Sequence, residues 1–286
     1  MPTTQQHHIR RQSFGGLPFL VRLLTLALLV GGLIGGIANF LLLPGFWPWE
    51  MSPLAYRFLA GAAAAYVVGA LITLTRSRWA ESEVLLATVI LYAIPLVGAI
   101  LMQPTLIDWS KVVAQLFVGI VTPAVIISIG YVWGLRTRAS SQMAQPQGYV
   151  LRGYLLVVGL LTLVVGTVVF VIPKQSGFVW PWAALDTWQP LDSRLIASML
   201  LTIAGGALLA WWRNDEGVAQ VFLAMLFAYC VVAGIGLALH ALVTPEFVVA
   251  DLLYVGIFAI VLVVGTLLYP RGSAGHNDEA ERSILR

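Results

Sequence analysis

The amino-acid sequence predicts an all-α, polytopic membrane protein, and two observations carry that prediction: the composition and the length of the apolar blocks. Of the 286 residues, 59% are hydrophobic and 10% are charged, with a mean hydropathy of +0.90. A soluble domain carries about 25% charged residues. The composition therefore excludes a soluble enzyme, a nucleic-acid-binding domain and a secreted disulfide scaffold. The single cysteine, Cys230, has no partner for a disulfide within the chain.

The apolar blocks have the length of membrane-spanning helices. A helix needs about 20 apolar residues to cross the hydrocarbon core, whereas barrel strands alternate over about ten residues. The blocks here are apolar on every face, so we expect helices rather than a barrel. Eight segments qualify, at residues 18–43, 54–75, 83–103, 112–135, 150–172, 193–212, 218–240 and 249–269.

Basic residues predict the orientation of these spans, because cytoplasmic loops carry an excess of arginine and lysine. If the N-terminus is cytoplasmic, only four of the 16 basic residues lie outside, namely Arg57, Lys111, Lys174 and Arg194. We therefore expect both termini in the cytoplasm. All ten tryptophans fall at the edges of the predicted spans, where indoles prefer to lie. Only two of the basic residues are lysines, which is typical of a bacterium with a GC-rich genome, so we expect the protein in a bacterial plasma membrane.

The second half of the chain repeats the first. A shift of 137 positions aligns residues 53–92 with 190–229 without a gap and gives 12 identities in 40, including Arg57/Arg194 and Arg76/Arg213. Upstream, residues 47–49 and 180–182 both read Trp-Pro-Trp. Four spans in each half give the halves the same orientation, as in the parallel repeats of some transporters.

This register predicts how the chain is organised. Two four-helix repeats are expected at residues 18–135 and 150–270, joined by a cytoplasmic linker at 136–149. Short cytoplasmic tails at 1–17 and 271–286 complete the chain. The C-terminal tail mixes charges of both signs and lacks apolar periodicity, which is typical of disorder.

The candidate binding site lies at the outer ends of the repeats. Each half has a tryptophan–proline–tryptophan turn followed by Pro-Leu-x-x-Arg at the start of its second span. Two arginines at equivalent places, surrounded by indoles, predict a site for a small anion or a lipid phosphate. The alternative is that each arginine reaches the outer interface and pairs with a loop carboxylate. The residues of the candidate site are Arg57, Arg194, Trp47, Trp49, Trp180 and Trp182.

Three functions remain open. The first is a non-enzymatic small permease or a lipid- or anion-binding module, with membrane lipids and a small anion or lipid phosphate as partners. The second is a structural subunit of a larger membrane complex, with other membrane subunits as partners. The third is an outer-leaflet lipid-modifying enzyme, which would need Asp108, Asp192 and Asp251 to lie close together. No catalytic or metal-ligating set, cofactor or nucleic-acid partner is predicted, and a lone histidine such as His240 favours a solvated side chain over a ligand.

Overall fold

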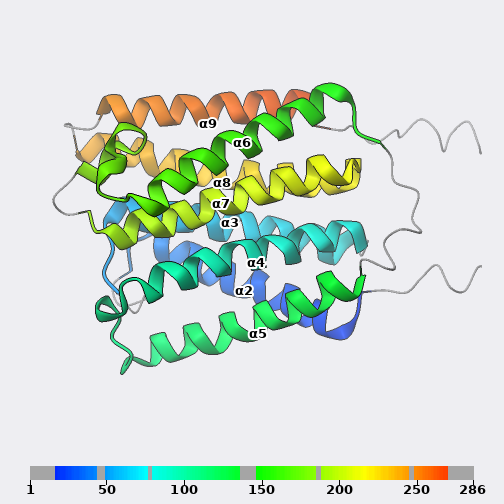
Figure 1. Ribbon diagram of the computed structural model, residues 1–286, viewed down its shortest axis with the longest axis horizontal. Coiled ribbons are helices and arrows are strands. Elements are labelled where there is room, and N and C mark those ends of the chain that lie inside the picture. Colours follow the sequence, from blue (N-terminus) through cyan, green and yellow to red (C-terminus); the bar gives the residue numbers. More distant parts are fainter. Residues whose placement is uncertain are drawn as a thin grey trace, which may run out of the picture.

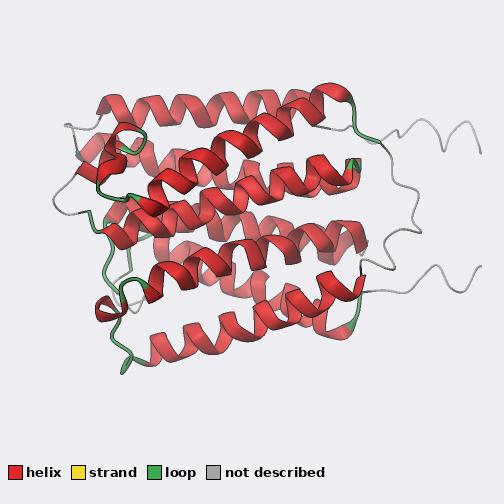
Figure 2. Cartoon of the chain, viewed as in Figure 1, coloured by secondary structure: helices red, strands yellow, loops and turns green. Residues whose placement is uncertain are grey.

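The computed structural model describes residues 17–43, 49–76, 79–135, 146–184, 188–244 and 248–269. In these ranges the chain forms eight long helices joined by short connections (Figures 1 and 2). Each overlaps one of the apolar blocks seen in the sequence. The helices are α2 (Phe19–Phe40), α3 (Pro53–Arg76), α4 (Trp79–Leu101), α5 (Val112–Leu135), α6 (Tyr149–Val171), α7 (Pro190–Arg213), α8 (Glu216–Val243) and α9 (Val248–Leu268).

Seven of these helices are long and apolar enough to cross a membrane, and the chain is therefore described as an integral membrane protein. The eighth, α5, has a shorter apolar stretch, at residues 117–133 of the described part of the chain. Prolines lie inside α4 and α5, at Pro95 and Pro123. Neighbouring helices and local adjustment satisfy the carbonyls that such prolines free.

The boundaries of α7 and α8 follow from local chemistry. Pro190 occupies the first turn of α7, where a missing N–H costs nothing, and Gln189 and Asp192 form a capping box before it. The helix ends at Asn214, which adopts a left-handed conformation (φ 51°) that asparagine tolerates. Asp215 then starts α8 by accepting hydrogen bonds from the backbone N–H groups of Gly217 and Val218.

Four helices form the centre of the bundle and four lie around it. In α3, α4, α7 and α8, half or more of the apolar window is buried, compared with less than a third in α2, α6 and α9. Helix α3 packs along α8, and α4 packs along α7. On the outside, α2 lies on α3, α6 on α7, α5 on α4 and α9 on α8. The core is thus the contact between the central helices.

The two ends of the bundle differ in the side chains that they carry. We call the end where α3, α7 and α9 begin the tryptophan end, since Trp49, Trp180 and Trp182 lie there. The opposite end, where α3 and α7 finish at Arg76 and Arg213, is the arginine end. Helix α2 begins and α9 finishes at the arginine end (Figure 1). The short 3₁₀ helices η4 (Gln175–Phe178) and η5 (Pro181–Ala184) form the longest described loop at the tryptophan end.

Candidate functional site

Arg57 lies about one turn inside α3 at the tryptophan end and points towards α8. Its Nη1 donates to the carbonyl oxygen of Gly236 at 3.5 Å, and its Nε is buried without a hydrogen-bond partner. A Cβ on Gly236 would lie 2.8 Å from the Cβ of Arg57, so the close approach of α3 to α8 depends on this glycine. Among the described residues, no carboxylate forms an ion pair with Arg57.

Arg194 holds the equivalent place in α7, and its side chain turns to another helix. Its Nε donates to the carbonyl oxygen of Phe170, near the end of α6, at 3.3 Å. Within the described ranges it also lacks a carboxylate partner. No hydrogen bond found there joins it to Arg57. The two arginines of the predicted site therefore contact different helices, Arg57 contacting α8 and Arg194 contacting α6.

The predicted tryptophans are packed inside the bundle. Trp180 and Trp182 are buried, with ring centroids 4.7 Å apart. Both lie against Phe58 of α3, at 5.3 and 6.2 Å between centroids. Trp49 is buried in a second cluster and meets Phe117 of α5 edge-on. These three indoles hold the tryptophan end together, and Trp47 lies outside the described residues.

The acidic residues that a lipid-modifying enzyme would need have separate partners. Asp192 is buried and accepts from the backbone N–H groups of Ser52 and Gln189. Asp108 is exposed in the loop before α5, where hydrogen bonds from the hydroxyl and backbone N–H of Ser110 lower the pKa of its carboxyl. In the part of the chain that the structure describes, no group of three His, Cys, Asp or Glu side chains could hold a metal ion.

Asp251 has partners that the sequence analysis missed. Its Oδ1 accepts from the Nε1 of Trp182 at 2.9 Å, and its Oδ2 lies 2.7 Å from the Nδ1 of His240. Asp251 is fully buried and His240 is 7% exposed, so the expectation of a solvated histidine is wrong. The signal was present: a histidine ends one span and a carboxylate starts the next, and the turn between them is short. This trio ties the loop containing η5 to α8 and α9.

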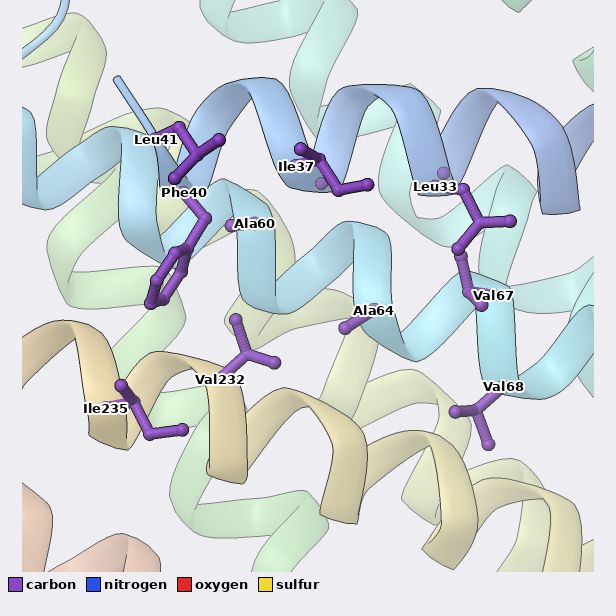
Figure 3. A pocket seen from close by; sticks show the side chains of 12 residues that line it. Leu33, Ile37, Phe40, Leu41, Ala60, Ala64, Val67, Val68, Val232 and Ile235 are labelled. Atoms are coloured by element: carbon purple, nitrogen blue, oxygen red, sulfur yellow. The ribbon is translucent and has the colours of Figure 1, made fainter. Parts of the chain in front are cut away.

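An apolar groove opens between α2, α3 and α8, with a volume of about 460 Å³. Figure 3 shows side chains of α2 on one side, those of α8 on the other, and Ala60 and Ala64 of α3 between them. The wall from α2 includes Gly36 and Phe40. Nothing in the sequence pointed to this groove, because the lining residues are ordinary membrane residues on three separate helices.

Comparison with known proteins leaves the site to be interpreted from its own geometry. No family model matches the chain, and no match was found among the curated proteins or the solved structures. Arg57 and Arg194 both lack a carboxylate partner in the described residues, and of the two only Arg57 has a buried Nε without a hydrogen-bond partner there.

Proposed function

We propose that the protein is a non-enzymatic membrane module of two parallel four-helix repeats, and that it binds a phosphate-type anion at the tryptophan end through Arg57. The repeats comprise residues 18–135 and 150–270, with α5 as the eighth span. The tryptophan end faces outwards, and both termini are in the cytoplasm of a bacterial cell. Each part of this proposal has its own support.

Packing at two glycines supports the duplication. Gly69 of α3 packs against Leu85 of α4 and Met225 of α8, and Gly206 of α7 packs against Phe222 and Thr88. The shift of 137 positions relates Gly69 to Gly206, Leu85 to Phe222 and Thr88 to Met225. The contact α3–α8 thus has its counterpart in α7–α4, residue for residue. Symmetric packing of this kind is expected from a fused pair of repeats.

Polar contacts at the arginine end support the same register. Arg76 donates to the side-chain oxygen of Gln220, and Arg213 forms an ion pair with Glu83. The shift that relates the two arginines also relates Glu83 to Gln220. Each arginine therefore reaches from one half to the other at an equivalent position.

The outer helices α2 and α6 also align, with a shift of 130 positions in place of 137. Aligning Arg22 with Arg152 also aligns Gly36 with Gly166 and Phe40 with Phe170. Gly36 packs on Ala63, and Gly166 packs on Leu200, which is the residue that the main register pairs with Ala63.

Orientation is testable by chemical labelling. Phe178, in η4 at the tryptophan end, is 75% exposed. We expect a Phe178→Cys variant in intact cells to react with a membrane-impermeant maleimide, because the excess of arginine predicts the opposite end in the cytoplasm. The native Cys230 is buried and gives a low background. A matched Phe19→Cys variant, equally exposed at the start of α2 at the arginine end, should react only after permeabilisation, and the reverse pattern would refute the orientation.

The binding function rests on the state of Arg57. A charged side chain on a membrane helix is costly, and it usually pairs with a carboxylate, reaches water or serves a ligand. Arg57 has one long hydrogen bond to a carbonyl and a buried Nε without a partner. A guanidinium with free donors matches the geometry of a phosphate, to which arginine binds with two parallel hydrogen bonds.

Native mass spectrometry of the protein, extracted gently from its own membrane, tests this function. We expect a retained lipid or small anion containing phosphate. Arg57→Gln should lower its occupancy about ten-fold, because a charged hydrogen bond contributes roughly 1.5 kcal/mol. Arg194→Gln is the matched control and should leave the occupancy unchanged. Equal occupancy in wild type and Arg57→Gln would refute the assignment. Stoichiometric foreign polypeptides without any bound anion would favour a structural subunit instead.

A further inference from the structure

The walls of the apolar groove from α2 and α8 lie in the half of the bundle nearer the tryptophan end, and its floor on α3 spans the middle of that helix. Its α2 wall runs along residues 32–41, the last part of that helix, and its α3 floor runs from Ala60 to Val68. At 1.5 Å per residue, the floor is roughly 12 Å long. One leaflet of the hydrocarbon core is about 15 Å thick, half of the ~30 Å total. The groove therefore matches the depth of a single leaflet.

Arg57 is not itself a lining residue, but it lies about one turn before Ala60, the first residue of α3 that lines the groove. Successive residues of a helix are 100° apart, so Arg57, Ala64 and Val68 fall along one face of α3. Ala64 and Val68 line the groove. On the facing helix, the carbonyl that Arg57 contacts belongs to Gly236, which follows the lining residue Ile235. The guanidinium of Arg57 and the apolar groove are thus neighbours along α3 and α8.

We propose that the groove holds one acyl chain of an anionic glycerophospholipid from the surrounding leaflet, with the lipid phosphate at Arg57. This inference rests on the proposed anion binding and adds the apolar part of the ligand. The charge of Arg57 complements the phosphate, and the groove offers the lipid chain an apolar surface of the required depth. A free phosphate ion has no apolar part that could occupy the groove.

The corresponding surface of the second half is filled. Gly205 is the counterpart of Val68, and a Cβ on it would lie 2.6 Å from Leu91 Cδ1. Phe170, the counterpart of Phe40, lies against Gly98, and its carbonyl oxygen accepts from Arg194. In the second half, side chains of the protein therefore lie along the counterpart of the groove, and the Nε of Arg194 is bound to a backbone carbonyl. We expect one lipid for each chain.

The test uses the full-length protein in detergent with added phosphatidylglycerol, read out by native mass spectrometry. Ala64→Phe places a ring in the groove, and Val232→Phe does so from α8 if the first variant folds poorly. The matched control is Ala27→Phe on the exposed face of α2, away from the groove. Each protein is titrated with long-chain phosphatidylglycerol, a short-chain analogue with the same head group, and inorganic phosphate.

Wild type should bind the long-chain lipid at least about ten-fold more tightly than the short-chain analogue. Ala64→Phe should abolish that preference while leaving binding of the short-chain analogue intact, and Ala27→Phe should keep it. Arg57→Gln should weaken both lipids. Equal binding of both chain lengths in wild type and Ala64→Phe would overturn the groove assignment and leave anion binding at Arg57 standing. Unchanged binding in Arg57→Gln would overturn the proposed function itself. A bound polypeptide helix that Ala64→Phe displaces, without lipid, would also overturn the inference.

Discussion

Arg57 and Arg194 lie at equivalent places in the first turns of α3 and α7, and each donates to one backbone carbonyl, but Arg57 reaches the other half and keeps a buried Nε without a partner, whereas Arg194 stays within its own half. Arg57 turns to Gly236 of α8 beside an open groove, while Arg194 turns to Phe170 of α6 beside a filled one. The contacts between the central helices involve residues that the shift of 137 positions pairs. The polar contacts and the side-chain sizes around Arg57 and Arg194, in contrast, differ between the two halves. Under the proposed duplication, the core contacts would be preserved in both halves and the proposed binding surface in only one.

The largest expected effect concerns Asp251 and its counterpart. The register that aligns Pro104 with Pro245 also aligns Ser110 with Asp251. Asp251→Ala leaves the buried groups of Trp182 and His240 without their acceptor. We expect a loss of about 3 kcal/mol in the free energy of unfolding, measured by denaturant unfolding in detergent.

A conservative variant sharpens this prediction. Asp251→Asn keeps one side-chain oxygen that accepts from Trp182, so its loss should be smaller than that of the alanine variant. Wild-type stability in Asp251→Ala would mean that the buried trio does not hold the loop to α8 and α9.

A reciprocal exchange at the arginine end should have the next largest effect. Glu83 is nearly buried where it pairs with Arg213, whereas Arg76, which contacts Gln220, is exposed. Glu83→Gln should cost about 2 kcal/mol of unfolding free energy, because it removes the negative charge of a shielded ion pair and leaves Arg213 only a neutral acceptor.

The reverse exchange, Gln220→Glu, creates an ion pair in a more solvated place. We expect a gain below about 1 kcal/mol, since exposed pairs contribute little. If the two variants changed the unfolding free energy by equal and opposite amounts, burial would not distinguish the contact of Glu83 with Arg213 from that of Gln220 with Arg76. The two halves would then not differ in the strength of this contact.

Opening the second groove sharpens the comparison of the two surfaces. Leu91→Ala removes the side chain that covers Gly205. Because Leu91 is only partly buried, we expect a modest loss of stability, about 1 kcal/mol, less than in a closed core. In native mass spectra, the number of bound phosphatidylglycerol molecules should rise above the wild-type value. An unchanged number would mean that the size of the channel does not set the difference between the halves.

The sequence predicted the positions of the helices well because length and apolarity determine them. Each long helix overlaps its predicted span, and Pro53 and Pro190 begin α3 and α7 close to the expected places. Composition alone also identified a membrane protein. These properties are summed over many residues, so errors at single positions matter little.

The contacts between helices could not be predicted from the sequence, because every span is apolar on all of its faces. The pairing of His240 with Asp251, the ion pair of Glu83 with Arg213 and the groove beside Arg57 all depend on which faces meet. The tryptophans illustrate the same limit. Their place at the span ends was readable, but their burial against side chains of the opposite half was not.

The smallest expected effect lies at Ser110, the counterpart of Asp251. Ser110 stabilises the ionised carboxylate of Asp108, mainly through its hydroxyl and then through its backbone N–H, and the pKa of Asp108 is lowered accordingly. A lowered pKa in the folded state means that this stabilisation is present above the unfolded pKa and is lost as the pH falls through the folded value. Ser110→Ala should therefore raise the pKa of Asp108 towards its ordinary value.

Carbon-13 NMR titration of labelled aspartate in detergent measures this shift. Lys111 lies 4.0 Å from the Asp108 carboxylate and contributes least to the lowered pKa, so Lys111→Met is the control and should raise the pKa of Asp108 less than Ser110→Ala does. A larger shift in the lysine variant would replace the hydrogen-bond explanation with a Coulombic one. Because Asp108 is exposed, both variants should move the unfolding midpoint at neutral pH only slightly, in contrast to Asp251→Ala. Equivalent positions in the two halves would then differ in burial, and burial would account for the difference in their contribution to stability.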